Sequence, residues 1–313
     1  MAKAVSTMNK QQRDDGWHRL FLFLENEYGV KVQKCTVIKP HVFLIETSRG
    51  KKVVKKYHTF LEASRQQMLS RLLKAEGFLA MPSIEGVISF VDDYWTVQPY
   101  IQAHRSFDYR IEKDREDSLT LLRTYHAFSE PFVRHPFFPT MVPRYFLYEK
   151  WLERYRRFLS MLPALQRLMK KEELSFVFSC AEAFFTYFPS YRSAFFAEQT
   201  TMIHGDVASH NFLRTETRSY LIDYDLLAIA PPAVDYLQYI SRVMPHVQWS
   251  VAFLTQHPML RTFMENPWFL AALLFPADVM RECRWIVQRN VPFTISQFDY
   301  RKQFVQKIMN MIR

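Results

Sequence analysis

The chain has 313 residues, of which 49% are hydrophobic and 23% are charged. This composition is typical of a globular protein with a large core, and it excludes a globally disordered chain. The net charge of +10 and the pI near 9.4 favour contact with an anionic partner. The basic residues are spread over the chain in short pairs, so no nucleic-acid-binding tract is indicated and no nucleic acid partner is expected.

No segment is expected to enter or cross a membrane. An apolar run at residues 269–275 ends at a proline, far short of the ~18–20 residues that span a bilayer. Residues 1–17 contain no apolar h-region, so no secretory signal is expected. The three cysteines, Cys35, Cys180 and Cys283, are far apart, which favours reduced thiols and a cytoplasmic site of synthesis.

The first hundred residues predict a small α+β lobe. Residues 14–28 and 60–78 place apolar side chains at helical spacing. Residues 42–58 contain two β-rich runs around Ser-Arg-Gly, and residues 87–101 contain two more around Asp92-Asp93. Each pair predicts a β-hairpin.

The rest of the chain predicts mostly helices. Helical periodicity is strong over residues 117–130, 146–174 and 173–188. Residues 130–146 are rich in proline and aromatic residues, and they predict a loop. The helical region is broken over residues 200–225, where short apolar runs surround polar residues.

The stretches MIHGDVASHNFL (202–213) and YLIDYD (220–225) have the clearest chemical pattern. They predict two short strands, with Asp206 and Asn211 in the loop between them and Asp223 at the end of the second. Magnesium prefers oxygen ligands from one or two protein groups and keeps several waters. A further carboxylate can accept the proton of an acceptor hydroxyl. The combination therefore predicts phosphoryl transfer with a magnesium nucleotide.

The residues HGDVASHNFL…YLIDYD…AVDYLQYI resemble the aminoglycoside phosphotransferase/choline kinase branch of the protein-kinase-like superfamily. Within this branch they are most similar to the endospore coat-associated kinase-like proteins of the CotS/YutH group, since Ser-His-Asn stands where antibiotic kinases usually carry Pro-Gly-Asn. The resemblance implies an α+β, protein-kinase-like two-lobed fold. The small β-rich N-lobe would be residues 1–101, and the larger, mainly helical C-lobe would be residues 102–313. It also implies Mg²⁺ and ATP as cofactors.

The resemblance assigns roles to residues of the C-lobe. Asp206 would be the catalytic base, and His204 would brace the catalytic loop by hydrogen bonds. Asp235 would pin the backbone of that loop from a following helix. Asn211 and Asp223 would hold magnesium. Asp225 is either a second acid near the metal or a turn former.

The resemblance also assigns residues of the N-lobe to the nucleotide. Lys55 would grip phosphate, with Lys56 as the alternative, because strand alternation places these two lysines on opposite faces. The segment that contains Gln98 and Tyr100 stands where the family offers backbone groups to adenine. Gln66 stands where the family has the glutamate that pairs with the lysine.

Two parts of the N-lobe depart from the pattern of an active kinase. The turn expected to cover the phosphates reads Lys39-Pro40-His41 and has no glycine; proline offers no N–H to a phosphate. Gln66 can hydrogen-bond a lysine but cannot pair with its charge, and Glu62 is the alternative one helical turn earlier. Both departures predict weak nucleotide binding.

Two functions remain open, and a third is least favoured. The first is a kinase-like protein of the spore coat that phosphorylates a hydroxyl of an unknown acceptor, made in the mother-cell cytoplasm. The second is a catalytically silent kinase-fold scaffold of the coat. Spore coat proteins are the expected partners in both. The third, a basic nucleic-acid-binding protein, lacks a motif. The net positive charge favours an anionic or neutral acceptor over a cationic one.

Overall fold

The structure is a computed structural model, and it describes residues 19, 21–26, 29 and 31–312. The chain divides into two compact units, residues 1–103 and 104–313. The predicted boundary lay between residues 101 and 102. A small antiparallel sheet in the first unit and a larger helical second unit confirm the predicted α+β architecture, with a β-rich N-terminal part and a mainly helical C-terminal part. Over the described ranges, no helix has both the length and the apolar character needed to span a bilayer.

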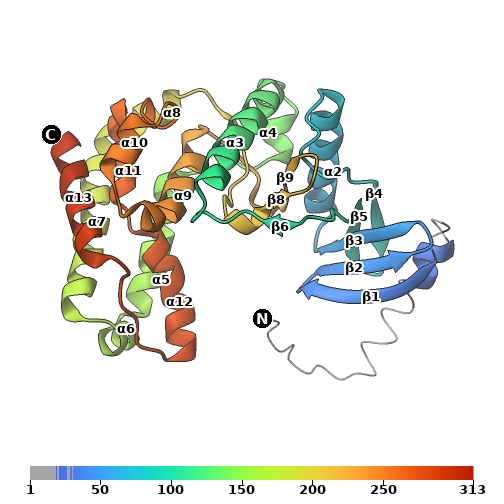
Figure 1. Cartoon of the computed structure of the whole chain (residues 1–313), viewed down its shortest axis with the longest axis horizontal. Coiled ribbons are helices and arrows are strands. Elements are labelled where there is room, and N and C mark those ends of the chain that lie inside the picture. The colour runs from blue at the N-terminus through green and yellow to red at the C-terminus, as the bar shows by residue number, and fades with distance from the viewer. Residues whose placement is uncertain (1–18, 20, 27–28, 30, 313) are drawn as a thin grey trace. The chain divides into compact units, whose positions relative to one another are not determined.

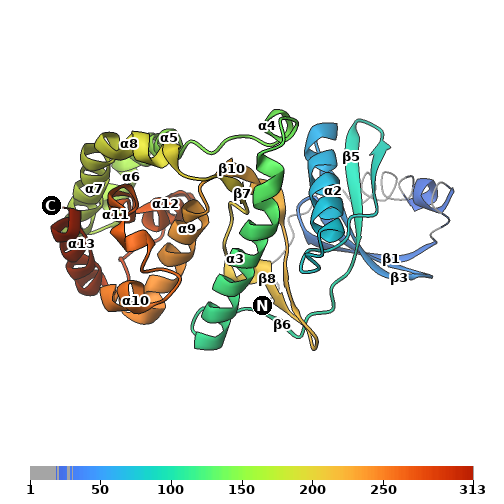
Figure 2. The ribbon, with the colours of Figure 1, turned by 90° about the horizontal axis from the view of Figure 1, so that it is seen from above.

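The first unit is built on one five-stranded antiparallel sheet with the strand order β1-β2-β3-β5-β4. Its strands are β1 (Val32–Lys39), β2 (Val42–Thr47), β3 (Gly50–Tyr57), β4 (Gly86–Phe90) and β5 (Asp93–Pro99). Helix α2 (Phe60–Ala75) lies against β3, β4 and β5, as Figure 2 shows. The two predicted hairpins are therefore β2–β3 and β4–β5.

Helix α2 has sequence-encoded signals at both ends. At its start Thr59 and Glu62 form a capping box, in which each side chain bonds the backbone N–H of the other. After its end Gly77 adopts a φ of +96°, the left-handed conformation that favours glycine. The buried positions Ala63 and Leu69 are fixed against the sheet between these ends.

A separate cluster of buried residues belongs to the same unit. Leu24 packs with Phe43, Ile45, Val54 and Trp95, among others. Leu24 comes from the predicted N-terminal helix, which is helical at residues 21–26. The remainder of that prediction, residues 14–18, 20 and 27–28, lies outside the described residues.

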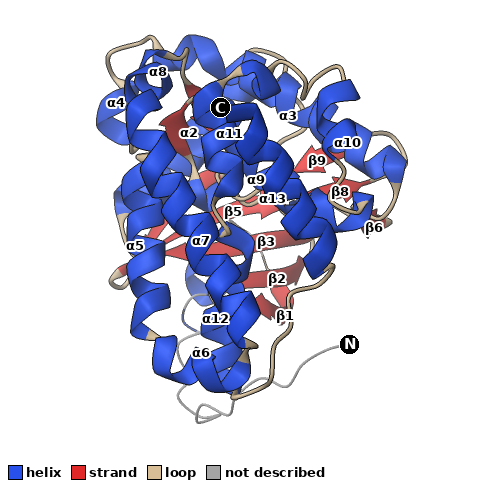
Figure 3. Ribbon diagram, turned by 90° about the vertical axis from the view of Figure 1, so that its left-hand side faces the viewer, coloured by secondary structure: helices blue, strands red, loops and turns tan. Residues whose placement is uncertain are grey.

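The second unit contains the remaining helices (Figure 1). They are α3 (Glu112–Val133), α4 (Phe138–Met141), α5 (Leu147–Ser160), α6 (Leu162–Leu168), α7 (Lys171–Tyr187), α8 (Arg192–Ala197), α9 (Ala233–Val243), α10 (Val251–Gln256), α11 (Pro267–Leu274), α12 (Ala277–Arg289) and α13 (Phe298–Ile312). Helices α7, α11 and α13 pack against one another, and α5 packs against α12 (Figure 3).

Two boundaries differ from the sequence-based predictions. The run at residues 146–174 is not one helix: it breaks between α5 and α6 and again before α7. Pro163 stands in the first turn of α6, where its missing N–H costs no helical hydrogen bond, so the new helix starts there. The predicted loop begins later than residue 130, because α3 continues through Pro131 to Val133.

Aromatic side chains fill the core between the helices of the second unit. Trp151 of α5 stacks on Phe275 with ring centroids 4.5 Å apart. Phe184 of α7 meets the edge of both rings, at 4.8 Å and 5.2 Å. Aromatic pairs in such geometries contribute about 0.5–1.5 kcal/mol beyond their burial. These contacts fix the positions of α5, α7 and the segment before α12 relative to one another.

Residues 200–230 form four short strands where the sequence predicted two. Strand β7 (Thr201–Ile203) pairs with β10 (Ala228–Ala230). Strand β8 (Phe212–Arg214) pairs with β9 (Ser219–Leu221) and with β6 (Arg105–Ser106). The loop that contains Asp206 therefore connects two small sheets.

Candidate functional site

The loop between β7 and β8 is held by one buried carboxylate. Asp235 of α9 accepts hydrogen bonds from the backbone N–H groups of His204 (2.7 Å) and Gly205 (2.9 Å). Its Oδ2 also lies 2.9 Å from Nε2 of His126 on α3. Asp235 is fully buried. These bonds fix the backbone just before Asp206, in the way the resemblance implied.

His204 connects this loop to the segment after β9. Its Nδ1 accepts from the backbone N–H of Asp206 at 3.2 Å, so the ring proton lies on Nε2, which donates to the carbonyl of Ile222 at 2.9 Å. Burial lowers the pKa of His204 below its usual value. The neutral ring therefore braces the loop and does not add charge to it.

Gly205 permits the close approach of a second backbone segment. Its φ is +80°, and a Cβ at this position would lie 2.2 Å from the carbonyl oxygen of Leu226. Any side chain here would displace the Leu226 backbone, so the loop requires glycine for both conformation and space.

Asp206 is half-exposed, and both of its carboxylate oxygens and its backbone carbonyl oxygen accept hydrogen bonds. Its Oδ1 accepts from Nη2 of Arg242 at 2.5 Å. The amide nitrogen of Asn211 donates to the Asp206 carbonyl oxygen at 2.9 Å and to its Oδ2 at 3.3 Å. Both carboxylate oxygens of the predicted base are therefore oriented. Arg242 was not predicted, since it lies far along the chain on α9 and belongs to no motif.

The predicted metal ligands come from two neighbouring backbone segments. Asn211 is buried, and its backbone carbonyl accepts from the N–H of Ile222 at 2.9 Å, which brings it beside the peptide that leads into Asp223. Because the amide nitrogen of Asn211 bonds to Asp206, its amide oxygen is the atom that would bind a metal. Asp223 has left-handed backbone angles (φ 69°, ψ 62°), and Asp225 is exposed in the following turn.

This donor set suits magnesium rather than a softer metal. Amide and carboxylate oxygens are its preferred protein ligands, and water completes its shell. Across the described residues, no group of three or more His, Cys, Asp or Glu side chains is arranged to hold a metal. The predicted ligands are one asparagine and two aspartates, so they are not such a group. The magnesium assignment to Asn211, Asp223 and Asp225 stays a prediction.

The two candidate phosphate lysines of the first unit have different surroundings. Lys56 lies on the face of the sheet that contains Val54, where its Nζ is 2.5 Å from a carboxylate oxygen of Asp93. Lys55 lies on the opposite face, with its Nζ 5.5 Å from the ring of Tyr57. Which of the two lysines contacts phosphate stays a prediction.

The other nucleotide-side residues are distributed over the first unit. Gln66 is buried on α2, Gln98 is half-buried near the end of β5, and Tyr100 follows that strand with its N–H bonded to the carbonyl of Lys51 at 3.0 Å. The structure neither brings these residues to a nucleotide nor contradicts that role.

The turn between β1 and β2 is closed without glycine. All three of its residues, Lys39, Pro40 and His41, are exposed. His41 takes a φ of 66°, and its carbonyl oxygen accepts from the N–H of Lys56 at 2.8 Å. A non-glycine residue in this conformation is uncommon, and the proline supplies no donor to a phosphate.

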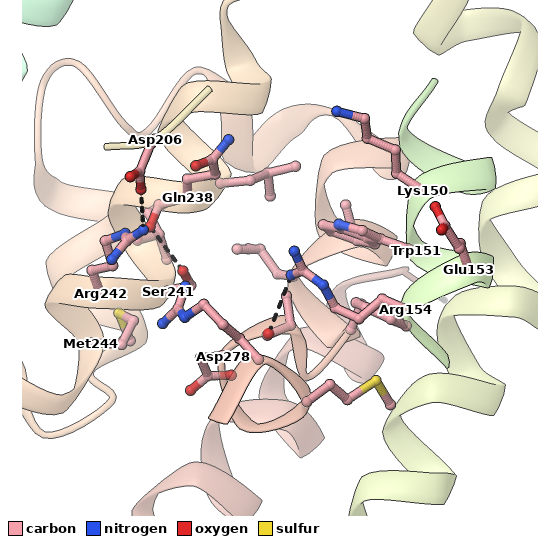
Figure 4. Close-up of a pocket in the computed structure, with 18 of the residues that line it drawn as sticks. Lys150, Trp151, Glu153, Arg154, Asp206, Gln238, Ser241, Arg242, Met244 and Asp278 are labelled. Atoms are coloured by element: carbon pink, nitrogen blue, oxygen red, sulfur yellow. Dashed lines mark hydrogen bonds and ion pairs between the residues drawn. The ribbon is translucent and has the colours of Figure 1, made fainter. Parts of the chain in front are cut away.

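A cavity of about 770 Å³ in the second unit opens beside the catalytic loop. Asp206 and Arg242 lie on one side of it, and Lys150, Trp151 and Arg154 lie on the facing side (Figure 4). The volume is in the range of small-molecule sites. A compound in this cavity would have the Asp206 carboxylate at its edge.

The fold is that of a kinase-like protein. The sequence profile of the Phosphotransferase enzyme family matches residues 38–255, and the chain belongs to this family. No curated protein sequence matches the chain as a relative.

Three solved structures illustrate the fold. A thermostable mutant of aminoglycoside phosphotransferase APH(4)-Ia is similar at a TM-score of 0.57 and 13% identity, covering 94% of this chain and 98% of that one. A choline kinase from Cryptosporidium parvum is similar at a TM-score of 0.54 and 11% identity, covering 94% and 95%. The streptomycin–ATP complex of APH(2")-IIa has a TM-score of 0.51 and 14% identity, covering 98% and 99%. At these identities the likeness shows the fold alone.

Proposed function

We propose that the protein is a phosphotransferase that moves the γ-phosphoryl group of Mg-ATP to a hydroxyl of an acceptor. The observation that carries this proposal is the pinned loop: Asp206 borders a cavity with both carboxylate oxygens oriented, and Asn211 lies beside the segment of Asp223. A fixed carboxylate next to a pair of oxygen ligands is the arrangement that phosphoryl transfer requires.

In this proposal each residue has one task. Asp206 accepts the proton of the acceptor hydroxyl as the oxygen bonds to the γ-phosphorus and ADP leaves. Asn211 and Asp223 would hold a magnesium ion, and that ion would neutralise charge on the phosphate oxygens. Lys55 contacts phosphate from the first unit. Similar solved structures are complexes with ATP and streptomycin, with ADP and hygromycin B, and with AMP, which supports a nucleotide.

We further propose that the protein acts at the spore coat, with coat proteins as its partners, as the resemblance of residues 202–240 implies. One observation favours a second candidate there, a catalytically silent scaffold. The turn over the expected phosphate position contains Pro40 and no glycine, so backbone N–H groups for phosphate are scarce. The scaffold would bind nucleotide weakly or not at all.

Calorimetric titration with Mg-ATP tests the proposal without knowledge of the acceptor. We expect the wild type to bind in the micromolar to submillimolar range and Asp223→Ala to lose binding. Asp225→Ala is the matched comparison: retained binding assigns Asp225 to the turn, and lost binding assigns it to the metal. At about 100 times the dissociation constant the nucleotide should stabilise the fold by about 2.7 kcal/mol. No heat and no thermal shift at millimolar nucleotide would refute the phosphotransferase and support the scaffold.

A further inference from the structure

The cavity beside Asp206 has an excess of positive charge. Six arginines and one lysine line it, against three carboxylates. Each carboxylate already has an arginine partner; the pairs are Arg242–Asp206, Arg157–Glu153 and Arg301–Asp278. The remaining four cations of the lining form no ion pair with these carboxylates.

These four cations are Lys150, Arg154, Arg281 and Arg284, and none has a carboxylate within ion-pair distance in the part of the chain that the structure describes. Lys150 and Arg154 lie one turn apart on α5, and the other two lie on α12, which packs against α5. Arg154 also donates to the carbonyl of Ala277 at 3.2 Å, at the start of α12. The cations thus belong to a fixed wall of two packed helices.

The cations repel one another across the cavity. Burial lowers the pKa of Arg154, and the charges of Arg281 and Arg157 lower it further. Burial and the charge of Arg281 also lower the pKa of Arg242, the partner of Asp206. Since a like charge disfavours the charged form, an anion bound among these groups would relieve the repulsion.

Two buried donors of the same lining have no partner among the described residues. They are the indole N–H of Trp249, a residue 7% exposed, and the Nε–H of Arg242. Buried donors normally find an acceptor. Beside them, the stacked rings of Trp151 and Phe275 offer an apolar wall for a carbon skeleton.

We propose that the acceptor is a small hydroxyl compound with a phosphate or carboxylate group, which Lys150, Arg154 and Arg281 bind while Asp206 faces the hydroxyl. This inference rests on the proposed function. The acceptor oxygen bonds to the γ-phosphorus of ATP, the bond from that phosphorus to the bridging oxygen breaks, ADP leaves, and the hydroxyl proton passes to Asp206. A compound with ammonium groups would meet like charge in this cavity.

The test is calorimetry without nucleotide, at constant ionic strength. The first probe is inorganic phosphate. The next three probes share one three-carbon skeleton: glycerol 3-phosphate, glycerate and glycerol. Choline is the cationic probe. The variant is Arg154→Gln/Arg281→Gln, and Arg281→Gln alone serves if the double variant does not fold. The control is Arg156→Gln/Arg289→Gln, which removes exposed arginines of the same two helices that do not line the cavity.

We expect the double variant to bind phosphate at least tenfold more weakly than the wild type, while the control binds as the wild type does. If the wild type binds glycerol 3-phosphate more tightly than glycerate, the acceptor carries a phosphate group. If it binds glycerate more tightly, the acceptor carries a carboxylate group. Glycerol or choline binding as tightly as the anions, an equal loss in the control, or no anion binding would overturn the inference. Anion binding in a protein that fails the Mg-ATP titration would leave an anion site and refute the phosphotransferase. Mg-ATP binding without anion binding would refute only the acceptor class.

Discussion

The catalytic loop of the second unit and the β1–β2 turn of the first unit differ sharply in how they are built. The loop at His204–Asp206 is buried up to its last residue, and Asp235 binds its backbone through two hydrogen bonds. The turn at Lys39–His41 is exposed and contains proline in place of glycine. The comparison teaches that the loop with the proposed base is preorganised, whereas the turn expected to cover phosphate has few backbone donors.

The largest effect should follow from removing the proposed base. We expect Asp206→Asn to lower turnover of Mg-ATP by about 10²–10⁴-fold, because asparagine cannot accept the hydroxyl proton. Phosphate release or transfer measures it. Glu216→Gln, an exposed carboxylate in the β8–β9 turn, is the control and should leave turnover unchanged. Equal activity of Asp206→Asn and wild type would remove the loop from the chemistry.

The next effect concerns stability of the same loop. Asp235→Asn replaces one acceptor oxygen with an N–H that faces a backbone donor, so we expect a loss of about 2–4 kcal/mol in the free energy of unfolding. Urea denaturation measures it. Glu265→Gln, at an exposed site whose side chain has no hydrogen-bond or ion-pair partner among the described residues, should stay within about 0.5 kcal/mol. A similarly small change for Asp235→Asn would mean that other contacts hold the loop.

A smaller effect should follow from replacing the proline of the β1–β2 turn, which we expect to tighten nucleotide binding. Pro40→Gly adds a backbone N–H and conformational freedom to the β1–β2 turn, and we expect it to tighten Mg-ATP binding severalfold, about 1 kcal/mol. Asp92→Gly, in the exposed β4–β5 turn, is the matched control and should not change the affinity. Unchanged binding in Pro40→Gly would show that this turn does not limit nucleotide affinity.

The smallest effect is a pH dependence of stability. Burial lowers the pKa of His204, so below about pH 6.5 the unfolded chain binds a proton that the folded chain does not. The free energy of unfolding should therefore fall as the pH is lowered from about 6.5, by at most ~1.4 kcal/mol per pH unit. His204→Gln should reduce this slope. His246→Gln, at a less buried histidine whose pKa burial also lowers, should reduce it less.

The sequence predicted the fold class, the superfamily and a polar loop between short strands that contains Asp206, because these depend on local patterns. Asp206 and Asn211 lie close together in the sequence, so their spacing in the loop can be recognised without a structure. Arg242 could not be predicted, since its contact with Asp206 depends on how α9 packs. The four cations of the cavity were not predicted: Lys150 and Arg154 recur at helical spacing on α5, but nothing in the sequence placed Arg281 and Arg284 of α12 beside them.

Asp223 has a left-handed backbone, which costs a non-glycine residue free energy of order 1 kcal/mol or more. Glycine would adopt the same angles at little cost, so Asp223→Gly is a substitution that selection for stability alone would favour. An aspartate at such a position is a trade-off in which the chain gives up stability and keeps a carboxylate. In a library selected only for thermal resistance, this site should drift toward glycine, and in one selected for function it should not.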